Sequence, residues 1–292
     1  MNEYLNKAKA NKCDEFYTRL VDIQNEMEYY KEYFKDKVVY CNCDDYKISN
    51  FVKYFKDNFE TLGLKKLIAT NYNIGNGAYC YEFNGKEEKI TTLKGNGSFD
   101  STECIEILKQ ADYAVTNIPF SLFRSYMNII HTYNKKFLVI GNTNAITFKE
   151  VFPYIKNNTL WVGYSSFNKG MYFYVPENYE YADTYKFDRA KDGKKAMRVA
   201  SVCWFTNIGE NKRKPIPLTK TFNESIYTKY DDCEGVECSK VEDIPFDYDG
   251  VIGVPITFVN KFCPEQFEIV GNISTPKIGD KSLYKRILIK KK

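Results

Sequence analysis

The sequence is poor in histidine, a common metal ligand. Its 292 residues include one histidine, His131. The nine cysteines are an odd number for a disulfide framework. Cys233 and Cys238 lie too far apart for the close pair of a zinc ribbon, whereas Cys41 and Cys43 lie too close together. We therefore expect reduced thiols and no metal.

Long apolar runs are also missing. No stretch approaches the roughly 20 residues that a membrane helix needs. Residues 1–16 are polar and carry both signs of charge, unlike a secretory signal. The hydrophobic share of 43% and the charged share of 27% are those of an ordinary globular protein. We therefore expect a cytoplasmic protein with no membrane contact.

Acidic residues are scarce in one part of the chain and crowded in the next. Residues 186–220 hold ten Lys or Arg and three acids, whereas residues 224–249 hold nine acids and two lysines. A second basic cluster covers residues 284–292. Segregated positive charge suits a polyanion such as a nucleic acid, because phosphate contacts supply most of its sequence-independent affinity. The alternative interpretation is a lysine-rich surface that meets only solvent.

The first half of the chain alternates helices and strands. The apolar spacing predicts helices over residues 14–33 and from Ser49 or Asn50 onward, and buried strands over 37–41 and 67–70. Asn84-Gly85 predicts a hairpin inserted at about residues 78–93. The pattern then predicts helix 98–110, strand 113–116, turn 117–120, helix 121–133 and strand 136–140. This order is typical of an α/β fold that binds its ligand at the carboxyl ends of parallel strands.

Farther along the chain, short β-rich pieces replace this alternation. They cover residues 159–164, 171–175, 199–206 and 251–259. No Pro- or Gly-rich linker marks a boundary. We divide the chain into a main α/β domain, residues 1–206, and a β-rich accessory region, residues 207–292.

The turn Asn117-Ile118-Pro119-Phe120 directly follows an apolar strand, and its residue types suit the activation of an aromatic amine. An aromatic amine is a poor nucleophile until two acceptors draw on its hydrogens. The Asn117 side-chain oxygen and the Ile118 carbonyl can be those acceptors, with Pro119 keeping the turn rigid and Phe120 stacking on a flat base. A base swung out of its helix could then attack a methyl donor in line. The alternative interpretation is a plain strand-ending turn.

The loop Cys41-Asn42-Cys43-Asp44-Asp45 lies where such a fold binds its cofactor. It lacks the glycines of a dinucleotide site. Asp44 or Asp45 could accept hydrogen bonds from a cofactor ammonium or ribose. Alternatively, these acids only complement the positive end of the helix that follows.

Together these residues resemble the EcoRI-type adenine-specific DNA methyltransferase family over nearly the whole chain. The resemblance rests on residues 14–18, 40–45, 49–51, 115–123, 141–142, 144–147, 204–207, 253–258 and 264–268. It implies a Rossmann-like class I S-adenosylmethionine-dependent methyltransferase that methylates N6 of a flipped adenine in duplex DNA. Residues 1–206 would be its catalytic domain and residues 207–292 its target-recognition region.

The resemblance also implies roles for individual residues. It places Phe16, Tyr17 and Thr18 near the methionine part of S-adenosylmethionine, Cys41 and residues 42–45 in the first cofactor loop, and Asp100 near the cofactor adenine. A cognate restriction endonuclease would act as a separate protein, and we expect the methyltransferase to be a monomer.

Two positions depart from the family pattern. Ile118 stands where the family usually has proline, but the role of this position is carried by its backbone carbonyl. No acid follows residues 67–70 to bind the cofactor ribose, so we assign that role to Thr70 or Asn71. A similar Asn-Ile-Pro-aromatic turn occurs in ribosomal RNA adenine methyltransferases of macrolide resistance. RNA methylation and a catalytically silent nucleic-acid-binding relative therefore stay as alternatives.

Overall fold

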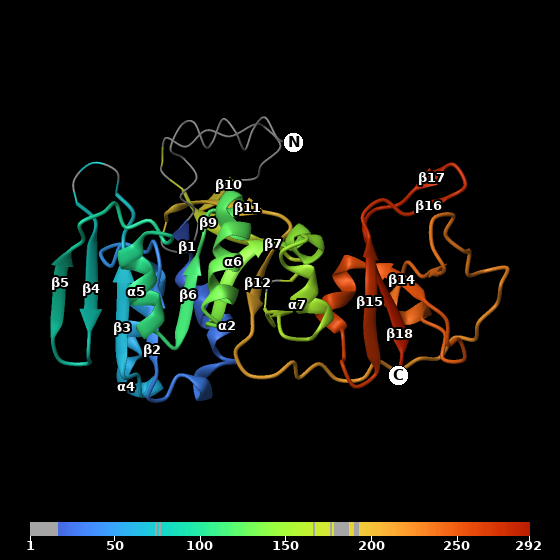
Figure 1. Cartoon of the computed structure of the whole chain (residues 1–292), viewed down its shortest axis with the longest axis horizontal. Coiled ribbons are helices and arrows are strands. Elements are labelled where there is room, and N and C mark those ends of the chain that lie inside the picture. The colour runs from blue at the N-terminus through green and yellow to red at the C-terminus, as the bar shows by residue number, and fades with distance from the viewer. Residues whose placement is uncertain are drawn as a thin grey trace. The chain divides into compact units, whose positions relative to one another are not determined.

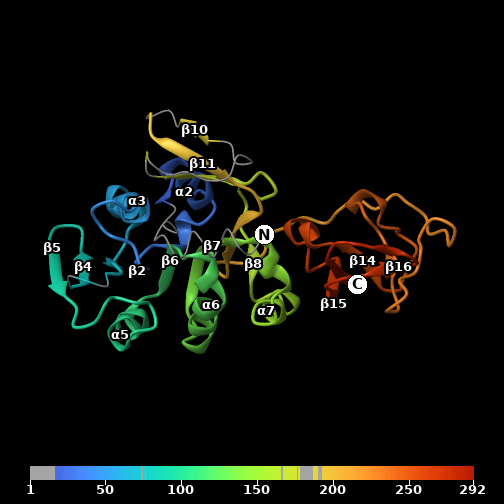
Figure 2. The same ribbon diagram turned by 90° about the horizontal axis from the view of Figure 1, so that it is seen from above.

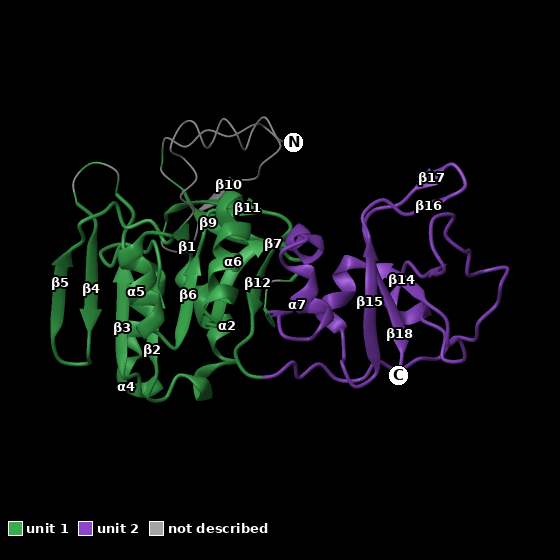
Figure 3. Ribbon diagram, viewed as in Figure 1, with its two compact units in different colours: residues 1–142, 163–209 green, residues 143–162, 210–292 purple. Residues whose placement is uncertain are grey.

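The protein forms two compact units (Figure 3). The computed structural model describes residues 17–73, 75, 77–165, 167–175, 177, 187–189 and 193–292. Unit 1 comprises residues 1–142 and 163–209, and unit 2 comprises residues 143–162 and 210–292.

A large sheet forms the centre of unit 1, with strands in the order β5-β4-β3-β2-β6-β7-β12. The inner strands β3, β2, β6 and β7 are parallel neighbours. Their carboxyl ends therefore meet at one edge of the sheet. The hairpin β4–β5 adds antiparallel strands beside β3, and β12 pairs antiparallel with β7. The bounds are β2 Val38–Cys41, β3 Lys66–Thr70, β4 Tyr79–Phe83, β5 Glu88–Thr92, β6 Tyr113–Asn117, β7 Lys136–Asn142 and β12 Val202–Thr206.

Helices cover both faces of this sheet. Figure 2 shows α2 and α3 on one face and α5 and α6 on the other. Ser49 caps α3 as its position predicts, because its hydroxyl accepts hydrogen bonds from the Phe51 and Val52 N–H groups. The bounds are α2 Leu20–Met27, α3 Asn50–Asp57, α4 Phe59–Leu62, α5 Thr102–Gln110 and α6 Phe123–Thr132, with 3₁₀ helices η1 Lys31–Tyr33 and η2 Phe120–Leu122.

A smaller antiparallel sheet completes unit 1, in the order β1-β9-β11-β10. Its first strand corrects the predicted helix over residues 14–33. Tyr17 and Thr18 pair with β9 and are extended, so the helix begins at Leu20. The bounds are β1 Tyr17–Thr18, β9 Met171–Tyr174, β10 Phe187–Arg189 and β11 Lys195–Val199.

Glu26 of α2 is a buried carboxylate that secures the chain after residue 162. It accepts hydrogen bonds from the Tyr30 hydroxyl (3.0 Å) and from the N–H groups of Tyr164 (2.9 Å) and Ser165 (2.7 Å). Burial raises the pKa of Glu26, although the hydrogen bonds from Ser165 oppose this shift. A Cβ at Gly163 would lie 2.3 Å from a Glu26 oxygen, so only glycine fits this close approach.

Unit 2 is built around a sheet in the order β13-β14-β18-β15 and a separate hairpin, β16–β17 (Figure 1). Phe258 and Phe267 pack edge to face in its core, with ring centroids 5.4 Å apart. The strands are β8 Trp161–Val162, β13 Val236–Glu237, β14 Ile252–Pro255, β15 Phe267–Ile273, β16 Lys277–Ile278, β17 Lys281–Ser282 and β18 Arg286–Lys291. The helices are η3 Thr143–Thr147, α7 Phe152–Lys156, η4 Val241–Asp243 and η5 Ile256–Lys261.

Two sequence predictions differ from the structure here. Residues 143–162 pack with unit 2, where the Lys156 ammonium donates to the Val270 carbonyl, rather than with the domain assigned to residues 1–206. Residues 251–259 are not one strand, because β14 ends at Pro255 and η5 follows. Proline has no N–H to continue a ladder, and the apolar residues after it are buried on a 3₁₀ helix instead.

Within the described residues, no helix is long and apolar enough to cross a membrane. Among these same residues, no three His, Cys, Asp or Glu side chains gather as a metal site would require. The eight described cysteines are free thiols, and most of them are buried.

Candidate active site

Thr116, the residue before Asn117, joins two strands at the carboxyl edge of the large sheet. Its hydroxyl lies 2.7 Å from the Asn42 carbonyl and 2.6 Å from a carboxylate oxygen of Asp44. The other Asp44 oxygen accepts a 2.6 Å hydrogen bond from the Ser49 hydroxyl. The loop after β2 is thereby tied to the end of β6 and to the start of α3.

Asp44 holds its proton more tightly than a surface carboxyl. Burial raises the pKa of Asp44 to about 7, while the hydrogen bonds from Ser49 and Thr116 oppose the shift. The geometry fits this direction. The single hydroxyl proton of Thr116 can serve either the Asn42 carbonyl or Asp44, but not both. A protonated Asp44 can donate to Thr116, which then donates to Asn42.

Replacing Asp44 by asparagine should change how stability depends on pH. The native pKa of Asp44 lies above the unfolded value, so the contribution of Asp44 to wild-type stability is fully present below about pH 4 and is lost as pH rises through about 7. The asparagine side chain keeps one acceptor and one donor but has no charge. We expect the stability of Asp44→Asn relative to wild type to rise by about 2–3 kcal/mol between pH 5 and pH 8. Urea unfolding at both pH values measures this, and an equal difference at the two pH values would contradict it.

Asn42 and Asp100 are brought to the same region by two aromatic residues. Asn42 is fully buried, and its side-chain oxygen accepts a 3.3 Å hydrogen bond from the Tyr126 hydroxyl. The Tyr126 ring packs edge to face on Phe99, with centroids 5.4 Å apart. Burial raises the pKa of the Cys43 thiol, nearby Asp44 adds to this, and the Phe99 backbone opposes it. Asp100 is exposed and also contributes to the Cys43 shift, so it lies close to this loop.

The segment around Thr18 reaches the same loop through α3. The Asn50 side chain donates a 2.8 Å hydrogen bond to the Thr18 carbonyl, and Asn50 is the first residue of α3. Tyr17 of β1 pairs with Tyr174 of β9. Phe16 lies outside the described residues. Two buried polar atoms here have no hydrogen-bond partner in the described part of the chain, the Thr18 hydroxyl and the Asn42 side-chain nitrogen. Such atoms are costly unless a ligand or water satisfies them.

The remaining predicted cofactor residues already contact the protein. Asp45 accepts hydrogen bonds from the Lys47 N–H (2.9 Å) and from the Tyr79 hydroxyl. The buried Thr70 hydroxyl bonds to the Tyr40 hydroxyl at 2.8 Å. The Asn71 side-chain oxygen accepts from the Tyr79 N–H at 2.8 Å and so extends the pairing of β3 with β4. The Thr70 hydroxyl and the Asn71 side-chain oxygen therefore already form hydrogen bonds within the sheet.

The turn at Asn117 begins where β6 ends. Asn117 is the last residue of β6, opposite Ile140 of β7, and is half-buried. The Ile118 side chain is fully buried, and Phe120 rests against the hydrophobic core while keeping part of its surface exposed. The Pro119 carbonyl accepts a 2.8 Å hydrogen bond from the Leu122 N–H, which starts η2. The turn therefore lies one residue beyond the Thr116 link to Asp44.

Thr116 and Tyr126 were not predicted as site residues. The sequence pattern indicates Thr116 only as a strand residue, although its place beside Asn117 was a signal. Tyr126 lies inside a predicted helix, where an aromatic residue normally indicates the core. Its contact with Asn42 joins α6 to a loop 84 residues earlier in the chain.

Comparison with known proteins assigns the chain to a family. The profile described as adenine-specific methyltransferase EcoRI matches residues 4–292. The chain belongs to this family. It is 45% identical to Type II methyltransferase M.EcoRI of Escherichia coli, over 100% of this chain and 97% of that protein.

Two mycoplasma proteins are also similar. Type II methyltransferase M.MgeORF184P of Mycoplasma genitalium is 41% identical, over 94% of this chain and 87% of its own. Type II methyltransferase M.MpnI of Mycoplasma pneumoniae is 42% identical, over 94% of this chain and 86% of its own. None of the solved structures matches this chain significantly.

Proposed function

We propose that this family member is a site-specific DNA methyltransferase that transfers the methyl group of S-adenosylmethionine to N6 of a flipped adenine. Its unit 1 would have the Rossmann-like class I fold of such enzymes. The observation that carries the proposal is the position of Asn117-Ile118-Pro119-Phe120. This turn ends an inner parallel strand and is tied through Thr116 to the Asp44 loop. Family membership and the strand order support the same assignment.

The turn provides the groups that the amine needs. The Asn117 side-chain oxygen and the Ile118 carbonyl would accept the two hydrogens of adenine N6 and leave its lone pair free to attack. Phe120 is half-buried, and a base would stack on its ring. Because the reaction is a displacement, positioning rather than a strong base supplies most of the rate.

The residues around the first loop fit S-adenosylmethionine. The unsatisfied Thr18 hydroxyl and Asn42 nitrogen can donate hydrogen bonds to the carboxylate of its methionine part. Asp44 or Asp45 would accept from its ammonium, and exposed Asp100 would lie toward its adenine or ribose. When bound, the cofactor supplies the activated methyl group. We keep Tyr17 and Cys41 as neighbours of the same site and assign no ribose contact to Thr70 or Asn71.

Unit 2 would recognise the DNA. It contains the basic cluster of residues 284–292 and four basic residues of the 186–220 segment, Lys212, Arg213, Lys214 and Lys220. A DNA substrate would place the enzyme in the cytoplasm. The enzyme would work as a monomer, and any cognate restriction endonuclease would be a separate protein.

Transfer of labelled methyl groups tests the function. We expect purified protein to label duplex DNA and not RNA when both are offered with S-adenosylmethionine. Long-read sequencing of DNA from cells that express it should show N6-methyladenine in one short sequence context. Labelling of RNA alone would favour an RNA methyltransferase. No labelling, together with no S-adenosylmethionine binding by calorimetry, would favour a catalytically silent relative.

A further inference from the structure

The hairpin β16–β17 of unit 2 is a short, exposed ribbon with a positive charge. Lys277 pairs with Ser282 and Ile278 with Lys281, which leaves Gly279 and Asp280 as a two-residue turn. Gly279 has a φ of +56°, as the first turn position of such a hairpin requires. Both lysines are exposed, and Figure 1 shows the hairpin extending beyond the end of β15.

The base of the ribbon is held rigidly. The Leu283 N–H donates to the Pro276 carbonyl at 2.8 Å and closes the hairpin. On one side, the Asp231 N–H donates to the Lys277 carbonyl at 3.0 Å. On the other, the Arg286 guanidinium donates to the Tyr284 carbonyl at 2.7 Å. A projecting element with so firm a base loses little entropy when it contacts a partner.

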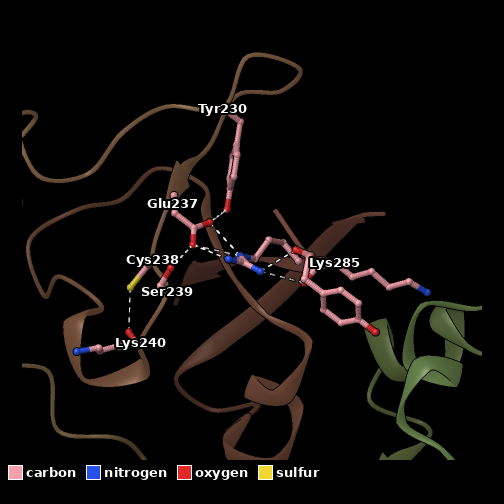
Figure 4. Close-up of polar contacts among 8 residues, drawn as sticks. Tyr230, Glu237, Cys238, Ser239, Lys240 and Lys285 are labelled. Carbon is pink, nitrogen blue, oxygen red and sulfur yellow. Dashed lines mark hydrogen bonds and ion pairs between the residues drawn. The ribbon is translucent and has the colours of Figure 1, made fainter. Parts of the chain in front are cut away.

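A buried ion pair fixes Arg286 itself. The guanidinium binds both oxygens of Glu237 at 2.8 and 2.9 Å, and the Arg286 side chain is 8% exposed. Figure 4 shows Tyr230 and Ser239 also pointing at the Glu237 carboxylate, where their hydroxyls donate hydrogen bonds. The carboxylate and the guanidinium are therefore well satisfied, and Arg286 holds the main chain at Tyr284 in one position.

Tyr284 and Lys285 continue the ribbon surface. The Tyr284 side chain is exposed, with a relative accessibility of 59%, and its hydroxyl donates to the Asn144 side chain. Lys285 extends away from Glu237 in Figure 4, and its ammonium donates to the Thr147 hydroxyl at 2.9 Å. Basic side chains interleaved with an exposed aromatic ring suit a nucleic acid, which offers both phosphates and flat bases.

We propose that the β16–β17 ribbon, with Tyr284 at its base, enters the major groove of the DNA substrate. This inference rests on the proposed function. A two-stranded ribbon fits the width of the major groove, where lysine can donate to guanine and a carboxylate such as Asp280 can accept from cytosine. The ammonium groups of Lys277 and Lys281 lie on opposite strands of the ribbon and would contact the groove and its flanking phosphates.

The test compares two pairs of lysines in the full-length protein. The ribbon variant combines Lys277→Ala and Lys281→Ala and removes two positive charges from the ribbon. The control variant combines Lys229→Ala and Lys240→Ala and removes two positive charges from exposed positions of unit 2 outside the ribbon. We expect the ribbon variant to bind a methylatable duplex about 10-fold or more weakly, with a salt slope lower by about 2. Its kcat at saturating DNA and its affinity for S-adenosylmethionine should match wild type. The control variant should bind like wild type.

Two outcomes would overturn the ribbon proposal. One is unchanged DNA affinity in the ribbon variant, and the other is an equal loss in the control variant, which would indicate only general attraction. The tip residue adds a separate readout, because Asp280→Asn should broaden the sequence context methylated in cells. Fluorescence anisotropy measures DNA binding without catalysis. A wild-type protein that binds DNA through the ribbon but transfers no methyl group would therefore contradict the proposed function alone.

Discussion

Replacing Asn117 by alanine should lower kcat for DNA methylation by at least about 100- to 1,000-fold, the effect of removing one preorganised hydrogen-bonding group from a transition state. The side-chain oxygen of Asn117 is one of two acceptors proposed for the adenine amine, and without it the lone pair stays delocalised into the ring. The affinity for S-adenosylmethionine should remain near the wild-type value, because the Thr18 and Asn42 atoms assigned to the cofactor are unchanged. Single-turnover methylation and calorimetry measure the two quantities.

Asn117→Asp is the matched control. Aspartate has the same reach and keeps an acceptor oxygen, so this variant should retain far more activity than Asn117→Ala. Full activity of the alanine variant would reject the Asn117 turn as the catalytic site. A parallel loss of cofactor binding would instead mean that the substitution had disturbed the end of β6.

Replacing Glu237 by alanine should destabilise the protein by about 3–5 kcal/mol, because it leaves the Arg286 guanidinium buried without its partner. The Tyr230 and Ser239 hydroxyls would lose their acceptor as well. Both strands that this pair joins, β13 and β18, flank β14 in the sheet of unit 2. Urea unfolding followed by tyrosine fluorescence or circular dichroism measures the loss.

The double variant Glu237→Leu with Arg286→Met separates a missing contact from an unpaired charge. Removing both charged groups together often costs little, whereas removing one of them costs much. We therefore expect the double variant to be clearly more stable than Glu237→Ala. Equal destabilisation of the two variants would show that the charge of Arg286 is not the cause. The double variant should also bind DNA more weakly, since the main chain at Tyr284 loses its anchor.

Much of unit 1 follows from patterns between near neighbours in the chain. Alternating apolar strands and helices, the Ser49 cap and the Asn84-Gly85 turn each depend on residues a few positions apart, and they predict the α/β order up to β7. The Asn117 turn could be placed at the end of a strand for the same reason. These features are local, so the energies that select them are visible in short stretches of sequence.

The linked site and the extent of unit 2 depend on contacts between distant residues. The Thr116 hydroxyl meets Asp44 across 72 positions, and Tyr126 meets Asn42 across 84. No linker or change of pattern separates residues 143–162 from the residues before them. They nevertheless join unit 2 through contacts such as that of Lys156 with Val270, 114 positions away. The sequence by itself determined the order of strands and helices from β2 to β7 and placed the Asn117 turn at the end of a strand. Only the tertiary structure decided which buried groups satisfy one another, because hydrogen bonds and packing across the fold set that choice and leave no periodic trace along the chain.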